Sequence, residues 1–86
     1  MFCEVTNHVT IHNKGDSTAS KYFYTMPLDN HEKLAHIYAK VEGDNINLLD
    51  IDFVETTENY ALYKIKMPRG VKPGNESILH ITEVLS

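Results

Sequence analysis

The stretch that decides the predicted fold is LDIDFVETTENYALYKIKM, residues 49–67. Apolar residues alternate with charged ones on both sides of the polar segment 55–59. This period of two predicts two strands, over residues 49–53 and 61–67, each with one buried and one exposed face. The short polar connection between them favours an antiparallel hairpin.

The charged residues predict the register of this hairpin. If Asp52 lies opposite Lys64, the same antiparallel ladder places Asp50 opposite Lys66. On the other face it pairs apolar side chains, Ile51 with Ile65 and Phe53 with Tyr63. Opposite charges then meet outside and apolar groups meet inside, as cross-strand energetics prefer. A slip by a single residue would exchange the two faces.

Other segments also have strand character. Residues 2–12 alternate, and Cys3 shares its parity with the apolar residues, so we expect Cys3 to be buried. Residues 21–26 are rich in aromatic residues and predict a strand that Pro27 ends. Residues 77–85 are β-branched and aliphatic, which favours a strand. Their apolar spacing also fits a C-terminal helix, and that alternative stays open.

Residues 29–43 predict a helix. Apolar residues recur there with the spacing of one helix face, at Leu34, Ile37, Tyr38 and Val41. Asp29 and Glu32 have the spacing of a capping box, and Gly43 has the place of a left-handed C-terminal cap.

The predicted fold class is therefore α+β, with the element order β-β-α-β-β-β. We expect a mostly antiparallel sheet of about five strands with one helix packed on one face. Short links between successive strands favour hairpins. The 86 residues form a single domain, 1–86. A chain of this length buries only about 60–65% of its unfolded surface, so the core is thin.

Composition narrows the function. The chain has 8 Lys and Arg against 12 Asp and Glu, a net charge of −4, which argues against a general nucleic-acid binder. Its single cysteine cannot form an internal disulfide, so we expect a reducing compartment. The N-terminus lacks the pattern of a signal peptide, and no apolar run reaches the roughly 18 residues of a membrane span. We therefore expect a cytoplasmic protein with no membrane contact.

No motif predicts a catalytic residue, a cofactor or a metal, and we expect the chain not to be an enzyme. His8 and His12 share a strand face but lie roughly 13 Å apart at the usual rise of a strand. Zinc bonds of about 2 Å cannot bridge that gap. Cys3, expected in the core, would be an inert thiol. A small hydrolase or nuclease, with histidines brought together by the fold, is the least favoured alternative.

Several apolar residues fall on the exposed parity of the hairpin. The predicted register places Val54 opposite Leu62, with Tyr60 beside them. An exposed patch of this kind is typical of an interface, although a loop or the second strand could cover it. With the surrounding charges, the predicted interface consists of Val54, Tyr60, Leu62, Asp50, Asp52, Lys64 and Lys66. We expect it to bind a second copy of the chain, as a homodimer, or another protein.

Residues 68–75 contain two prolines and two glycines and predict an irregular loop. Arg69 and Lys72, together with backbone N–H groups, could hold an anion there. This gives an alternative function, a regulatory domain that binds a nucleotide or another small molecule. The spacing matches no nucleotide-binding fingerprint, so a plain connecting loop is the other interpretation.

In size, acidity and lack of catalytic groups, the chain resembles small phage-encoded early proteins that inhibit a host enzyme or defence system. The likeness covers these properties and not aligned residues. It implies a non-enzymatic protein–protein interaction module that occludes a host protein in the host cytoplasm.

Overall fold

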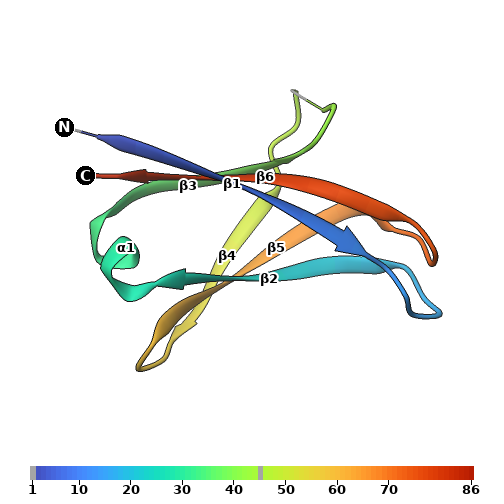
Figure 1. The fold of residues 1–86 in the computed structure, drawn as a ribbon, viewed down its shortest axis with the longest axis horizontal. Coiled ribbons are helices and arrows are strands. Elements are labelled where there is room, and N and C mark those ends of the chain that lie inside the picture. Colours follow the sequence, from blue (N-terminus) through green and yellow to red (C-terminus); the bar gives the residue numbers. More distant parts are fainter. Residues whose placement is uncertain (1, 45) are drawn as a thin grey trace.

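The computed structural model describes residues 2–44 and 46–86 and packs two antiparallel sheets face to face (Figure 1). Strands account for 67% of the structure. Over the described residues the elements are β1 (Cys3–His12), β2 (Ala19–Pro27), α1 (Leu28–Lys33), β3 (Leu34–Val41), β4 (Asp50–Thr56), β5 (Tyr60–Val71) and β6 (Glu76–Leu85). The fold is therefore essentially all-β, and the α+β class predicted from the sequence is wrong.

Each sheet has three strands, in the orders β1-β6-β3 and β2-β5-β4. The chain crosses between the sheets after β1, through α1 between β2 and β3, after β3 and after β5, and β4–β5 is a hairpin of consecutive strands within one sheet. Apolar residues of both inner faces form the core, as in other sandwiches. The central strands β5 and β6 supply most of it, including the fully buried Ile65, Leu79 and Ile81.

The hairpin register predicted from charge is confirmed. Asp50 lies opposite Lys66, and Asp52 lies opposite Lys64. The apolar pairs follow, with Ile51 opposite Ile65 and Phe53 opposite Tyr63. Because a single-residue slip would have buried the charged face, the patterning alone was enough to specify this ladder.

The predicted helix over residues 29–43 is mostly a strand. Only Leu28–Lys33 is helical, and Leu34–Val41 forms β3 on the free side of β6. Ala39 is fully buried in this strand, and the alternate residues Ile37 and Val41 pack against the core. Pairing with β6 provides backbone hydrogen bonds along one edge of the segment, and this gain, together with burial, outweighs a helical apolar spacing. This is why the sheet of about five strands under one packed helix is not formed.

The residues predicted to cap the two ends of that helix do not cap it in the structure. α1 begins after Pro27 without a side-chain capping hydrogen bond, so Asp29 and Glu32 form no capping box. Gly43 has a positive φ of 89°, as a left-handed cap would, but it lies in the turn that follows β3.

The C-terminal segment Glu76–Leu85 is a strand, so the helical alternative is wrong there. It lies at the centre of its sheet, where both of its edges are paired. The predicted loop 68–75 is shorter than expected, because β5 continues to Val71. Between the pairs Lys21–Lys66 and Ala19–Val71 the register shifts, and the extra β5 residues form a bulge around Pro68, which has no N–H to give to a ladder.

Cys3 is exposed, contrary to the expectation of a core thiol. It pairs with Leu85 at the terminal ends of β1 and β6. Figure 1 shows these ends extending past the strands of the other sheet. The parity of Cys3 is that of the core-facing side, but no facing strand covers it at this position.

Candidate functional site

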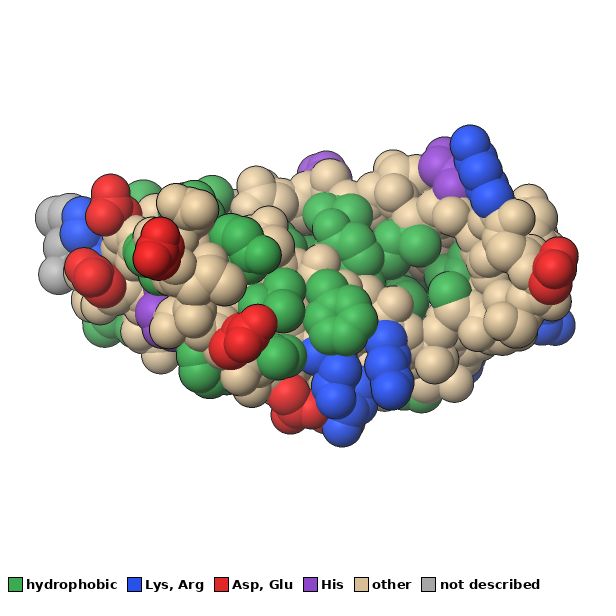
Figure 2. Space-filling view, turned by 90° about the horizontal axis from the view of Figure 1, so that it is seen from below, with side chains coloured by type: hydrophobic (Ala, Val, Ile, Leu, Met, Phe, Trp, Pro, Cys, Tyr) green, Lys and Arg blue, Asp and Glu red, His purple; other side chains and the backbone are tan. Residues whose placement is uncertain are grey.

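The outer face of the β2–β5–β4 sheet, called the outer face below, collects the side chains predicted to form an interface. In β5 the odd-numbered Tyr63 and Ile65 are buried, whereas Leu62 and Lys64 are partly exposed and Lys66 is exposed. Figure 2 views the molecule from this side and shows apolar side chains gathered at the centre, with lysines beside them and acidic groups near by. The structure therefore brings the predicted apolar and charged residues onto one surface.

Two rows of side chains cross this surface. The first consists of Phe23, Lys64 and Asp52 on neighbouring strands. The second consists of Lys21, Lys66 and Asp50. Each row runs from β2 to an acidic group on β4, and the Nζ of Lys66 lies 3.1 Å from an oxygen of Asp52 across the rows. Both side chains of this ion pair are about half exposed, so it contributes little stability, about 0–1 kcal/mol.

Phe23 is the residue of this surface that the sequence reasoning missed. Its side chain is 54% exposed at the middle of β2. Its neighbours Tyr22 and Tyr24 turn inward, and Tyr24 is buried. The alternation of residues along β2 could have revealed it, because Phe23 lies on the opposite side of the strand from Tyr22 and Tyr24 and on the same side as Lys21.

Val54 and Tyr60 are exposed as expected, but the predicted pairing of Val54 with Leu62 is wrong. The register shifts between Phe53 and Glu55, so that Glu55 lies opposite Leu62 and Val54 is the extra residue. A bulge of this kind bends an edge strand and re-aims its side chains. Val54 therefore stays at the margin of the outer face.

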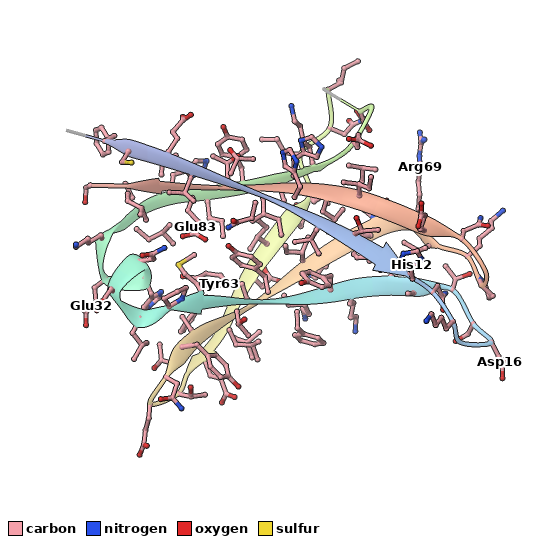
Figure 3. All side chains as sticks on the ribbon, viewed as in Figure 1. His12, Asp16, Glu32, Tyr63, Arg69 and Glu83 are labelled. Carbon is pink, nitrogen blue, oxygen red and sulfur yellow. The ribbon has the colours of Figure 1, made fainter. Side chains whose placement is uncertain are left out.

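Between the sheets, near the end where β2 runs into α1, a buried polar cluster surrounds Glu83. The carboxylate of Glu83, 1% exposed, accepts hydrogen bonds from the hydroxyl of Tyr24 and from the side-chain amide of Asn30 at 3.1 Å. The amide of Asn7 donates to the Tyr24 oxygen at 2.7 Å and to Glu83 at 3.5 Å. Figure 3 shows Glu83 between the sheets, close to α1. Three elements besides β6 are tied together by this one carboxylate.

Two tyrosines near this cluster have raised pKa values. Burial raises the pKa of Tyr24, and the hydrogen bond to Glu83 adds to the shift. Burial also raises the pKa of Tyr63, with a smaller contribution from the charge of Glu83. The Tyr63 hydroxyl lies 2.6 Å from Nδ1 of His31, whose ring stacks on Phe53 at a centroid distance of 5.3 Å. Phe53, expected in the core, is 53% exposed and covers this end of the sheet instead.

Arg69 and Lys72, the predicted anion site, lie at the far end of β5. Both are exposed and line a shallow depression of about 290 Å³ next to Glu76. Arg69 also borders a larger open cleft of about 680 Å³ between β5 and the segment that follows β3. Figure 3 shows Arg69 projecting outward from the strands. The structure brings the two cations to one depression, and anion binding there stays a prediction.

Asp44, in the segment that borders the larger cleft, has a lowered pKa. Hydrogen bonds from the backbone amides of Asn47 and Ile46 are the main cause, and Arg69 adds a small charge effect. These bonds hold the loop in a defined turn, as short acidic side chains commonly do. The lowered pKa is thus explained by loop structure.

Residues 2–44 and 46–86 were also searched for metal ligands and for membrane-spanning helices. No group of three or more His, Cys, Asp or Glu side chains there is arranged to hold a metal ion. None of the helices in these residues has the length and apolar character that crossing a membrane requires.

A family model described as Ribophorin I matches residues 1–86, the whole of the chain. The chain belongs to the ribophorin I family. No curated protein matches it closely enough to report.

Membership of the ribophorin I family corrects several expectations. It overturns the resemblance to phage-encoded early proteins and the function as an inhibitor of a host enzyme or defence protein. Ribophorin I proteins lie in the lumen of the endoplasmic reticulum or at its membrane, so the expected cytoplasmic location is wrong. A single cysteine forbids an internal disulfide in any compartment, and its count could not distinguish the lumen from the cytoplasm.

Proposed function

We propose that this chain is a non-catalytic β-sandwich module of an oligosaccharyltransferase complex in the endoplasmic reticulum, and that it lies on the lumenal side. The match to the ribophorin I family over residues 1–86 carries the proposal, because this family is a non-catalytic component of that complex. A sandwich with exposed side chains on an outer sheet face suits a module that makes protein contacts.

The outer face of the β2–β5–β4 sheet is the proposed contact surface. Phe23, Val54 and Tyr60 are 54%, 45% and 37% exposed there, and partly buried Leu62 lies on the central strand β5, between β2 and β4. Aromatic side chains are enriched at protein interfaces because they bury a large area with few rotatable bonds. The aspartates of β4, Asp50 and Asp52, and the lysines of β5, Lys64 and Lys66, would favour one orientation of the partner through charge complementarity.

The partner proposed is another protein of the complex. The family is part of a membrane-associated assembly and gives no support to the membrane-free homodimer expected from the sequence. The surface is mixed in charge and only partly apolar, as in non-obligate interfaces.

The test is co-purification of the complex with the natural full-length protein, carrying an affinity tag, from cells that make it. Phe23→Glu places a charge at the centre of the outer face and should reduce the yield of partner subunits at least several-fold. Thr10→Glu is the matched control, since Thr10 is exposed on β1 of the other sheet. Circular dichroism and thermal melting should show both variants folded.

Two results would count against the proposal. Absence of the unmodified protein from the complex would overturn the function. Equal recovery of partner subunits with Phe23→Glu and with Thr10→Glu would overturn the choice of surface and leave the function in place.

A further inference from the structure

The turn between β5 and β6 carries the triplet Asn75-Glu76-Ser77. An asparagine followed two positions later by serine or threonine, without an intervening proline, is the acceptor signal for N-linked glycosylation. The chain has seven asparagines, and only Asn75 has this context. In a lumenal protein such a triplet is chemically meaningful, provided that the asparagine side chain is accessible.

Asn75 is accessible, and its side chain is free. The residue is exposed at the end of the turn. Its backbone is engaged, because its N–H donates to the carbonyl of Lys72 at 3.0 Å and its carbonyl accepts from the N–H of Asn13 at 3.0 Å. Among residues 2–44 and 46–86, none forms a hydrogen bond to the side-chain amide of Asn75. The turn is held in place while the reactive group points into solvent.

Asn13 shows the contrasting case in the same region. It is 9% exposed, and its side-chain amide donates to the carbonyls of Ser17 at 2.8 Å and Val71 at 2.7 Å. A glycan on such an amide would break buried hydrogen bonds. On Asn75 it would break none that the structure shows.

The position is also compatible with the proposed contact surface. Asn75 follows the C-terminal end of β5, whereas Tyr60 begins this strand of 12 residues. At about 3.3 Å per residue, the two ends of β5 lie roughly 35 Å apart. A glycan on Asn75 would extend from the end of the sandwich near Arg69 and Lys72, which line a depression together with Asn75. The apolar part of the outer face would stay uncovered.

We infer that Asn75 is an N-glycosylation site of this protein, an inference that rests on the proposed lumenal location. The donor is an oligosaccharide linked to a lipid diphosphate. The bond between the anomeric carbon of its first sugar and the diphosphate oxygen breaks, and a bond from that carbon to Nδ2 of Asn75 forms. Asn75 gives up one amide proton, and the lipid diphosphate departs as the leaving group.

The test uses the natural full-length protein expressed in eukaryotic cells, with two measurements on the same material. Protease protection in sealed microsomes reports whether the chain lies in the lumen. Treatment with an amidase that releases N-glycans reports glycosylation, as a single downward step in electrophoretic mobility. Mass spectrometry should then find aspartate at position 75 of the released peptide.

Four variants locate the glycan. Asn75→Gln and Ser77→Ala should each abolish the mobility step. Ser77→Thr retains the acceptor signal and should retain the step. Asn59→Gln makes the same chemical change at an exposed asparagine outside the triplet, and it should leave the step unchanged.

The outcomes separate this inference from the proposed function. A lumenal protein without the step, or with a step that survives Asn75→Gln, overturns the inference and leaves the proposed function standing. A protein found outside the lumen without the step overturns both.

Discussion

The hydroxyl group of Tyr24 on β2 donates a hydrogen bond to the buried carboxylate of Glu83 on β6, and this contact joins the two sheets through the core. None of the ion pairs formed by residues 2–44 and 46–86 includes Glu83. Its carboxylate oxygens instead accept hydrogen bonds from the neutral side chains of Tyr24, Asn7 and Asn30. A buried charge without such donors would be too costly to retain, so the cluster acts as a unit.

Stability should fall at alkaline pH because of Tyr24. Its pKa in the folded chain lies above the ordinary 10.0, so folding favours the protonated phenol. That contribution is complete below pH 10 and is lost as the pH rises above it, at up to about 1.4 kcal/mol per pH unit for one group. Tyr63, whose pKa is also raised, changes stability in the same direction.

Tyr24→Phe tests this pH dependence. We expect it to lower the free energy of unfolding by about 1–3 kcal/mol at neutral pH, because Glu83 loses a donor. Its decline above pH 10 should be shallower than that of the unmodified chain. Urea unfolding at a series of pH values gives both quantities, with Tyr60→Phe as a surface control. An identical alkaline slope in Tyr24→Phe would contradict the assignment.

Glu83→Ala should be among the most damaging single substitutions. It leaves the donors of Tyr24 and Asn30 buried without an acceptor and removes packed volume, which together cost about 3–5 kcal/mol. Glu83→Gln keeps the shape and one acceptor oxygen, and we expect a loss of about 1–2 kcal/mol. Chemical denaturation measures the difference. The exposed Glu76→Gln should stay within about 0.5 kcal/mol of the unmodified chain.

Gly70→Ala should destabilise the bulge of β5. Gly70 has a φ of +65°, and an added Cβ would lie 2.5 Å from a side-chain carbon of Thr18 and 2.9 Å from the carbonyl oxygen of Ala19. The left-handed backbone alone costs about 1–2 kcal/mol with a side chain, and the collision adds to it. Gly74→Ala is the matched control, with a φ of +81° and no atom within 4 Å of the added Cβ. Thermal melting should rank Gly70→Ala clearly below Gly74→Ala.

The Lys66–Asp52 ion pair should contribute little to folding. A double-mutant cycle with Lys66→Ala and Asp52→Ala is expected to give a coupling energy below about 1 kcal/mol. The coupling should shrink further in 1 M salt, where screening acts over about 3 Å. A salt-independent coupling above that value would mean that the pair is shielded from solvent, against the half-exposed side chains seen here.

Cys3 should react rapidly with a bulky thiol reagent under native conditions. Because Cys3 is exposed at the end of β1, the reagent can reach the sulfur without any unfolding of the chain. The rate should be close to that of the denatured chain at the same pH. Strong native protection would place Cys3 in a contact that the structure does not show.

Much of the hairpin could be predicted from residues 49–67, because alternation and charge act between neighbouring strands and are readable in the sequence. The strand β1 was likewise foreseen from its period-two pattern, whereas β6 was favoured by its β-branched and aliphatic residues with a helix left as the alternative. The bulge at Val54 could not be foreseen, since it depends on how the edge strand bends around its neighbours. The same alternation also predicts that Phe23 is exposed, but its position between two tyrosines made the whole segment look like a buried aromatic strand.

The buried cluster had no signal of its own in the sequence. Asn7, Tyr24, Asn30 and Glu83 are spread over four elements and meet only after the sheets pack. Glu83 on a C-terminal strand would ordinarily be placed in solvent, because a carboxylate is seldom buried without partners. Its partners come from residues 53 to 76 positions away, and no local pattern reports them.

The sequence by itself determined the strand character of β1, β2, β4 and β5 and the register of the β4–β5 hairpin, because side-chain alternation and charge pairing are local properties. It left β6 open between a strand and a helix, and the pairing of both edges of β6 decided for the strand. Only the tertiary structure decided that residues 34–41 are a strand. Their apolar spacing suits a helix. As a strand, however, the segment pairs with the edge of β6 and packs its apolar side chains against the core between the sheets. Backbone pairing and burial act between segments distant in sequence, and there they outweighed the local preference.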